Sequence, residues 1–232
     1  MDNNNSFKPF LAISLMKIAV PIIAEFQKDV LNEINEATKS KPDIIELRID
    51  YLKTEPNIKA LIQECKKYNL QTIITNRAKD EGGYFKGNEF QRIKILQESV
   101  NHSPDYVDVE LMHFRSAFYK GKSRLIVSYH NFDETPNNLD NFYKKAYDCG
   151  ADIAKIVTKA NSNEDVRRMA ELIEKADKPI IGICMGDLGI STRLHPKNYL
   201  TFACLPGRPS ASGQMTVDYI KEYLSSLNQS EQ

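Results

Sequence analysis

The sequence of 232 residues lacks a net charge, a long apolar run and the pattern of a signal peptide. Lysine plus arginine equal aspartate plus glutamate, 31 against 31. Such a balance gives no general reason to expect nucleic acid or an anionic membrane as a partner. No apolar run is long enough to cross a bilayer. Residues 1–6 are polar and Asn-rich rather than basic and then apolar. We therefore expect a protein of the cytoplasm.

Cysteine is scarce, and its spacing excludes the usual thiol motifs. Cys65, Cys149, Cys184 and Cys204 are far apart and form no Cys-x-x-Cys pair. We expect free thiols, mostly buried, as is usual in a reducing cytosol. The sequence also lacks internal repeats, and its only low-complexity tract is the short asparagine run at the start.

Eight short runs rich in isoleucine and valine are present. Many are nearly continuous apolar stretches, which is typical of parallel strands that are covered on both faces. The eight predicted strands are residues 17–24, 43–50, 71–76, 106–112, 124–130, 152–159, 179–185 and 200–205.

Helical spacing of apolar residues separates most of these runs. It occurs at residues 28–38, 58–67, 90–100, 113–120, 139–149, 163–176 and 216–227, whereas residues 186–198 make a poor helix with two glycines and one proline. Strand and helix alternate with short connections, which favours one domain over residues 1–232, a (β/α)₈ TIM barrel. An open doubly wound sheet is the alternative fold. The apolar residues 7–15 are a candidate extra strand or hairpin over the N-terminal mouth.

A lysine stands in the middle of the sixth predicted strand. Ile153, Ala154, Ile156 and Val157 surround Lys155 with apolar groups. A lysine avoids the cost of burial by losing its charge, and a neutral amine can form a Schiff base with a ketone. Alternatively, the side chain reaches the strand end or pairs with an acid such as Asp152.

Charged residues also mark the carboxyl ends of the second and third strands, where barrels carry their reactive groups. Glu46, Arg48 and Asp50 alternate onto one face of the second strand. They are either a salt-bridged plug or groups that hold substrate hydroxyls. Arg77 and Glu81 follow the third strand, before Gly82-Gly83, and such loop charges are also common on surfaces.

The fifth, seventh and eighth strands end in further polar groups. His130 ends the fifth strand, beside the strand of Lys155, and an imidazole there suits proton transfer. Arg193 follows the seventh strand, and its planar fork fits a carboxylate. Residues 206–214 follow the eighth strand and contain the glycines and prolines of a loop that closes over a site.

Together these residues resemble the type I 3-dehydroquinase family, and the likeness spans nearly the whole chain. The matching pieces are Glu46-Leu-Arg48-Ile-Asp50, Arg77-Ala-Lys-Asp-Glu81-Gly-Gly, Ser128-Tyr-His130-Asn-Phe132, Ala154-Lys155-Ile, Ser191-Thr-Arg193-Leu and Ser210-Ala-Ser-Gly-Gln214. Six pieces occur in order at near-family spacing. The resemblance implies a Schiff-base dehydratase that converts 3-dehydroquinate to 3-dehydroshikimate in aromatic amino acid biosynthesis.

The resemblance also implies a role for each matching catalytic residue. Lys155 would condense with the C3 ketone as a covalent imine, so that no cofactor or metal is needed. His130 would remove the C2 proton and then help the C1 hydroxyl to leave as water. Glu81 would orient and tune this histidine. The family is commonly homodimeric, which implies a homodimer here.

The remaining matches imply contacts with the substrate. Arg193 would hold the carboxylate, whereas Glu46, Arg48 and Arg77 would hold the ring hydroxyls. Ser210 and Gln214 would belong to the closing lid.

The chain departs from the family pattern at several positions that bear on the lid and on affinity. His195-Pro-Lys-Asn-Tyr199 replaces a helix start rich in small residues and glycine, and the connection to the lid is about two residues short. Ser212 replaces a common proline, and Pro21 stands where some members carry a polar residue.

Three other functions remain as alternatives. A class I aldolase acting on sugar phosphates would keep Lys155 but need a phosphate site near residues 186–189. A metal-dependent lyase or hydrolase would use Asp108, Glu110, His113 and His130 as ligands. A non-catalytic binding barrel would have no need of either Lys155 or His130.

Overall fold

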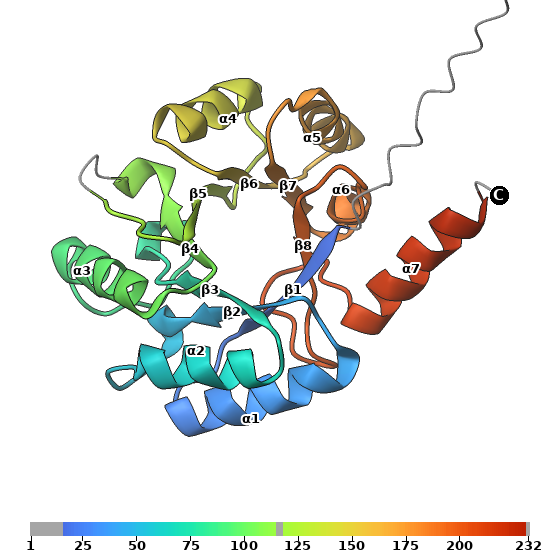
Figure 1. The fold of residues 1–232 in the computed structure, drawn as a ribbon. Helices are drawn as coiled ribbons and strands as arrows, with labels where there is room; N and C mark the ends of the chain where they lie inside the picture. Colours follow the sequence, from blue (N-terminus) through green and yellow to red (C-terminus); the bar gives the residue numbers. More distant parts are fainter. Residues whose placement is uncertain (1–15, 115–117, 231–232) are drawn as a thin grey trace, which may run out of the picture.

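The chain forms a nearly closed barrel of eight parallel strands (Figure 1). A computed structural model describes residues 16–114 and 118–230. The strands are β1 (Lys17–Ile22), β2 (Ile44–Arg48), β3 (Gln71–Thr75), β4 (Tyr106–Glu110), β5 (Arg124–Asn131), β6 (Ile153–Lys159), β7 (Ile180–Met185) and β8 (Leu200–Phe202). They pair in the order β7-β6-β5-β4-β3-β2-β1-β8. The predicted barrel is therefore confirmed over the alternative of an open doubly wound sheet.

Seven α-helices among the described residues surround the strands (Figure 1). They are α1 (Gln27–Ala37), α2 (Ile58–Lys67), α3 (Glu89–Ser99), α4 (Leu139–Asp148), α5 (Asn163–Lys175), α6 (Ile190–Arg193) and α7 (Val217–Ser230). Side-chain caps set several helix starts. At α5, for example, Ser162 and Asp165 form a capping box. As predicted, the segment between β7 and β8 holds only a short helix, α6.

The prediction of a helix at residues 113–120 is wrong for the residues of this range that the structure describes. Leu111–His113 form a single 3₁₀ turn, and residues 114 and 118–120 are irregular. Phe114 and Phe118 pack against the hydrophobic core from this connection. These two apolar residues, whose spacing suggested a helix, therefore anchor an irregular connection instead. The extra strand or hairpin predicted at residues 7–15 lies outside the described residues.

Side chains fill the barrel in layers. The alternation of inward and outward side chains along each strand sets the order of these layers. An apolar layer near the N-terminal ends comes from all eight strands: Ala19, Ile44, Ile73, Tyr106, Ile126, Ile153, Ile181 and Leu200. Two residues further along, β2, β5 and β6 turn the polar groups Glu46, Ser128 and Lys155 inward, whereas β7 and β8 place Ile183 and Phe202 at this level. The apolar layer forms a floor, and the mixed layer above it faces the C-terminal mouth.

The ladder of strand hydrogen bonds is interrupted between β7 and β8. Side-chain and turn hydrogen bonds bridge this seam instead. The amide oxygen of Asn198 accepts from the Gly182 backbone N–H at 2.7 Å, and its NH₂ donates to the Gly182 and Thr192 carbonyls. Tyr199 N–H donates to the Ile180 carbonyl at 2.8 Å. Asn198, from the segment that departs from the family pattern, therefore completes the barrel.

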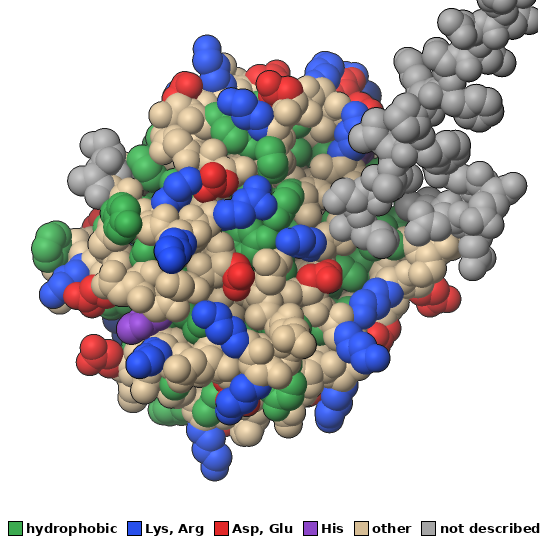
Figure 2. All heavy atoms as spheres, in the orientation of Figure 1, with side chains coloured by type: hydrophobic (Ala, Val, Ile, Leu, Met, Phe, Trp, Pro, Cys, Tyr) green, Lys and Arg blue, Asp and Glu red, His purple; other side chains and the backbone are tan. Residues whose placement is uncertain are grey.

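Charges of both signs are scattered over the face of the molecule shown in Figure 2. No helix in the described ranges is long and apolar enough to cross a membrane.

Candidate active site

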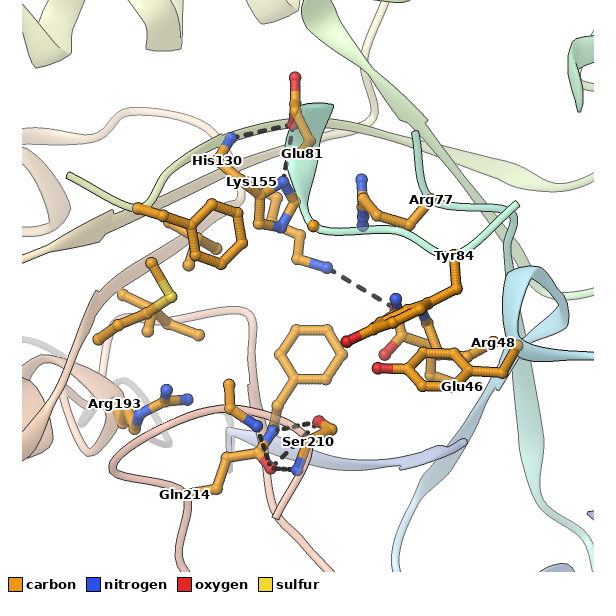
Figure 3. Close-up of a pocket in the computed structure, with 18 residues that line it drawn as sticks. Glu46, Arg48, Arg77, Glu81, Tyr84, His130, Lys155, Arg193, Ser210 and Gln214 are labelled. Carbon is orange, nitrogen blue, oxygen red and sulfur yellow. Dashed lines mark hydrogen bonds and ion pairs between the residues drawn. The ribbon is translucent and has the colours of Figure 1, made fainter. Parts of the chain in front are cut away.

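One cavity lies at the C-terminal ends of the strands and has a volume of about 290 Å³. The nine residues predicted as catalytic or substrate-binding all line it, although they come from six different segments of the chain (Figure 3). They are Glu46, Arg48, Arg77, Glu81, His130, Lys155, Arg193, Ser210 and Gln214. Strand ends and the loops that follow them therefore bring together the groups that the sequence singled out.

The amine of Lys155 projects from β6 into this cavity, and the side chain is almost entirely buried. Its Nζ donates a hydrogen bond to Asp108 Oδ2 at 2.9 Å and lies 3.8 Å from Glu46 Oε1. It also lies 4.3 Å from the centre of the Phe202 ring. The predicted alternative partner, Asp152, instead accepts from Lys120 at 2.5 Å. Lys159, four residues further along β6, is exposed. Lys155 is thus the strand lysine that meets the cavity.

His130 and Glu81 form a pair beside Lys155. His130 Nδ1 lies 2.8 Å from Glu81 Oε2, and the His130 backbone N–H donates to the same oxygen at 3.0 Å. Strands β5 and β6 are neighbours, with Ser128 opposite Lys155 and His130 opposite Val157. His130 therefore lies one step of the alternation closer to the mouth than Lys155. The pairing of Nδ1 leaves Nε2 to exchange protons with a bound molecule.

Burial shifts both members of this pair toward their uncharged forms. Burial raises the pKa of Glu81 to about 8, with Arg77 opposing the rise and Glu110 adding to it. Burial also lowers the pKa of His130 well below its ordinary value, and the positive charges of Arg77 and Lys155 lower it further. The imidazole is therefore neutral at neutral pH and can accept a proton.

Arg193 is a buried cation that no acidic side chain in the described part of the chain neutralises. Its Nη2 donates to the Ser212 carbonyl at 2.9 Å, and its Nε is buried without a hydrogen-bond partner. Burial lowers the pKa of this guanidinium to about 10. An unpaired guanidinium on a cavity wall is suited to bind an anionic group of a ligand.

Arg77, by contrast, is committed to a buried network of charges. It binds Asp108 at 2.8 Å, Glu110 at 3.0 Å and Ser128 Oγ at 2.6 Å. Glu110 also binds Arg92 from α3 at 2.7 Å. Arg77 therefore gives one edge of the cavity a fixed positive charge, and its position is set by β4 and β5.

The charged face predicted on β2 divides at the end of the strand. The alternation stops at Arg48, because residues 49–51 turn into a 3₁₀ helix. This turn brings Asp50 beside Arg48, and the two make hydrogen bonds of 2.9 and 2.8 Å. Glu46 stays inside the barrel and accepts from Thr75 Oγ1 at 2.8 Å. Glu46 and Arg48 line the cavity, whereas Asp50 supports Arg48 from outside it.

The loop after β8 covers one side of the cavity through Ser210 and Gln214. The Gln214 amide oxygen accepts from the backbone N–H groups of Ser210 and Ala211, at 2.7 and 3.2 Å. The Ser212 carbonyl meets Arg193 and the Gly186 N–H, so the loop is tied to the end of β7. In the structure, Gln214 thus braces the loop from within.

The sequence interpretation missed several residues around this cavity. Asp108, which the sequence suggested only as a ligand of the alternative metal site, is the closest partner of Lys155. Tyr51, Tyr84 and Phe202 line the cavity as well. Tyr51 ends the 3₁₀ turn after β2 and Tyr84 occupies an irregular loop, and in neither place does the sequence have a long enough period to predict the direction of a side chain.

The residues of the metal-site alternative do not converge. His113 binds Asp80 at 2.9 Å and approaches Glu89 at 3.3 Å. Asp108 and Glu110 are instead bound to Arg77. Within residues 16–114 and 118–230, no three histidine, cysteine or acidic side chains are grouped as metal ligands.

Comparison with known proteins identifies relatives along most of the chain. Residues 18–231 match the family model for type I 3-dehydroquinase. A 3-dehydroquinate dehydratase of Methanocaldococcus jannaschii is 40% identical over 195 residues, covering 78% of this chain and 85% of the relative. A bifunctional 3-dehydroquinate dehydratase/shikimate dehydrogenase of Arabidopsis thaliana is 36% identical over 213 residues, which is 86% of this chain but only 35% of that longer protein.

Solved structures give the same relationship. The crystal structure of 3-dehydroquinate dehydratase from Geobacillus kaustophilus is similar with a TM-score of 0.85 and 28% identity, and the match covers 93% of this chain and 92% of that one. A type I 3-dehydroquinate dehydratase from Clostridium difficile, with covalently modified comenic acid, is similar with a TM-score of 0.83, 28% identity and 93% coverage of each chain.

Proposed function

The chain belongs to the type I 3-dehydroquinase family, and we propose that Lys155 is the residue that forms the imine with its substrate, 3-dehydroquinate. The enzyme is a 3-dehydroquinate dehydratase, a hydro-lyase of the shikimate pathway that serves aromatic amino acid biosynthesis. One observation carries the assignment of residues. The amine of Lys155 and the His130–Glu81 pair line the same cavity, together with Arg193, which has no acidic partner among the described residues.

The proposed reaction begins at the Lys155 nitrogen. Lys155 first passes a proton to the His130 imidazole, and the resulting amine adds to the C3 carbonyl. The protonated His130 returns this proton to the C3 hydroxyl of the adduct, which leaves as water and gives an iminium ion. The iminium withdraws electrons from C2, so the C2 proton becomes acidic. Because the adduct is covalent, it supplies the electron sink without a cofactor.

His130 carries the protons in this proposal. Its uncharged imidazole accepts the C2 proton, the C2 electrons form the new double bond, and the C1–oxygen bond breaks. His130 then donates a proton to the departing hydroxide, which leaves as water. Hydrolysis of the imine releases 3-dehydroshikimate and restores Lys155. Glu81 is hydrogen-bonded to Nδ1 of His130. It thereby keeps Nε2 of His130 directed at the substrate and acts as a positioning residue.

The remaining cavity residues hold the substrate. Arg193 pairs with the carboxylate, for which its unpaired guanidinium is suited. Glu46, Arg48 and Arg77 hold the ring hydroxyls, with Arg77 acting from its fixed place in the buried charge network. Ser210 and Gln214 belong to the loop that covers the bound substrate.

Reductive trapping tests the proposal directly. Incubation with 3-dehydroquinate and sodium borohydride should add one reduced substrate to the protein, inactivate it, and place the adduct on Lys155 by peptide mass mapping. Lys155→Ala should lose dehydration by several orders of magnitude and form no adduct. Lys159→Ala, which removes the exposed lysine of the same strand, is the matched control and should keep both properties. Undiminished dehydration in Lys155→Ala would exclude Lys155 from this role.

We further propose that the chain acts as one catalytic domain, assembles as a homodimer and works in the cytoplasm. The family resemblance supports the dimer, and the four cysteines, all free, support a reducing compartment. Sedimentation equilibrium should give about twice the 26.5 kDa of one chain, and a mass of one chain would contradict the dimer.

A further inference from the structure

Two tyrosines form a wall on one side of the cavity, and we call them the Tyr51–Tyr84 wall. Their ring centres lie 4.5 Å apart at an angle of 41°. Figure 3 shows the ring of Tyr84 beside the cavity with its hydroxyl turned toward the interior, and Arg193 on the opposite side. Tyr84 remains 61% exposed, so burial in the core does not account for its position.

The wall is connected to Arg48 through a closed set of contacts. The Tyr84 backbone N–H donates to Asp50 Oδ2 at 3.2 Å, and Asp50 holds Arg48 through two hydrogen bonds. The Arg48 guanidinium in turn lies 4.9 Å from the centre of the Tyr51 ring. A change in the position of either ring therefore affects the arginine that stands at the same end of the cavity.

The loop that carries Tyr84 has a fixed base and a free tip. A Cβ atom on Gly83 would lie 1.9 Å from the Arg77 carbonyl oxygen, so the backbones are in close contact there. Beyond this point, residues 84–87 line two separate surface hollows, one on each side of the loop. Tyr84, whose backbone is held by Asp50, therefore borders open space with its side chain.

The next step rests on the proposed function. In 3-dehydroquinate, C4 lies across the six-membered ring from C1, which bears the carboxylate. With the carboxylate at Arg193 and C3 on Lys155, the C4 and C5 hydroxyls face the opposite side of the cavity. We propose that the Tyr51–Tyr84 wall determines specificity for this vicinal diol, with the phenol hydroxyls hydrogen-bonding to it and the Tyr84 ring covering it.

The hydrogen-bonding chemistry of the wall fits this role. Two adjacent hydroxyls offer both donors and acceptors to the protein. The guanidinium of Arg48 only donates, whereas a phenol hydroxyl both donates and accepts. A site that hydrogen-bonds a substrate hydroxyl discriminates against analogues that lack it, because its polar groups are then left unpaired.

Steady-state kinetics with matched substrates test the inference. Wild type, Tyr84→Phe and Tyr51→Phe are compared on 3-dehydroquinate and on its 4-deoxy and 5-deoxy analogues. Removal of one phenol hydroxyl should lower kcat/KM on the full substrate about 3- to 10-fold, mainly through KM. On the analogue that lacks the substrate hydroxyl bound by that phenol, the variant and wild type should have the same kcat/KM. Tyr84→Ala, which also removes the covering ring, should lose more than Tyr84→Phe.

Tyr219→Phe is the control, because Tyr219 is 52% exposed on α7 and does not line the cavity. Equal losses on all three substrates, or unchanged kinetics in both Phe variants, would overturn the inference. Borohydride trapping of each variant separates this outcome from a failure of the proposed function. If a Tyr variant forms the Lys155 adduct and discriminates among the three substrates as wild type does, only the proposed role of the Tyr51–Tyr84 wall is refuted. If wild type forms no adduct, both the wall and the proposed function are refuted.

Discussion

Asp108 accepts hydrogen bonds from Lys155, Arg77 and Ser128 at one buried point inside the barrel. Burial acts to raise its pKa, but the charges of Arg77 and Lys155 outweigh burial and hold the pKa far below its usual range. Its negative charge thus compensates two buried cations at once. It also keeps Nζ of Lys155 in place before substrate arrives.

Replacement of Asp108 by asparagine should therefore destabilise the protein at neutral pH. The variant leaves buried cations without compensation, which costs about 3–5 kcal/mol when one partner of a buried pair is removed. Because the folded-state pKa is depressed, this stabilisation is present above the unfolded-state value, about 3.9, and is lost as the pH falls toward the folded-state value.

Urea unfolding of wild type and Asp108→Asn at neutral and acidic pH measures this effect. The difference in unfolding free energy should shrink as the pH falls below about 4. Asp133→Asn, at an exposed position, serves as the control and should show no such difference. A constant difference at both pH values would contradict the role of the Asp108 charge.

His130 makes a separate prediction about the pH dependence of catalysis. Burial, Arg77 and Lys155 all disfavour its protonated form, so the imidazole stays neutral at pH values where a free histidine is charged. The acidic limb of kcat/KM, which reports the free enzyme, should therefore lie below about pH 6.5. Initial rates from about pH 5 to about pH 8 give this profile. An acidic limb at or above the ordinary histidine value would show that the base is not shielded in this way.

The sequence was informative about residues whose position depends on one strand and uninformative about partners across the barrel. The apolar neighbours of Lys155 along β6 indicated a buried lysine, and its side chain is almost entirely buried. The identity of its partner depends on how β4 and β6 curve around the barrel, and Asp152, close in sequence, proved to be bound elsewhere. Tyr84 shows the same limit, because an irregular loop has no period from which the direction of a side chain follows.

At the scale of elements, the loop after β8 is positioned by backbone contacts with the end of β7. Gly213 has φ of +76°, and a Cβ atom there would lie 2.7 Å from the Gly186 carbonyl oxygen. Gly207 in the same loop has φ of +72°, but a Cβ atom there would meet nothing within 4 Å. The two glycines thus share a backbone conformation, but only Gly213 packs closely against the Gly186 carbonyl.

This difference yields a paired prediction for the lid. Both Gly207→Ala and Gly213→Ala incur the left-handed backbone cost of about 1–2 kcal/mol. Only Gly213→Ala also pushes the loop away from β7, so its kcat/KM should fall about tenfold or more below that of Gly207→Ala. Steady-state rates and borohydride trapping of both variants provide the measurement. Equal rates in the two variants would show that the contact with Gly186 does not position the lid.

The sequence predicted the ends of an element well where apolar residues recur at a regular spacing, and poorly where they do not. The helix predicted at residues 58–67 matches α2, because its apolar face and its asparagine cap are both local signals. The predicted strand at residues 200–205 extends beyond β8, which ends at Phe202. Ala203, Cys204 and Leu205 are buried after the strand has ended, and Cys204 and Leu205 make only isolated bridges, to Thr216 and Arg208.

At the scale of the whole molecule, the barrel is closed by strand pairing everywhere except between β7 and β8. The eight apolar runs predict how many strands there are, and their continuous apolar character and the helices between them predict that they are parallel, but neither pattern shows which neighbouring pair stays open. In the structure, the buried amide of Asn198 substitutes for missing ladder bonds at the Gly182 backbone. The segment between β7 and β8 thus both carries Arg193, which we propose binds the carboxylate, and closes the fold through Asn198.

Removal of this amide should weaken the seam between β7 and β8. Asn198→Ala leaves the buried N–H of Gly182 and the carbonyl of Thr192 without their partner, and each unsatisfied buried group costs about 1–3 kcal/mol. The loss should appear in urea unfolding, with amide hydrogen exchange accelerated most in β7 and β8. Asn137→Ala, at an exposed position before α4, should leave both measurements unchanged. If exchange instead increased equally in all eight strands, the amide would act on global stability alone, and closure at this seam would depend on the Tyr199 backbone bond to Ile180.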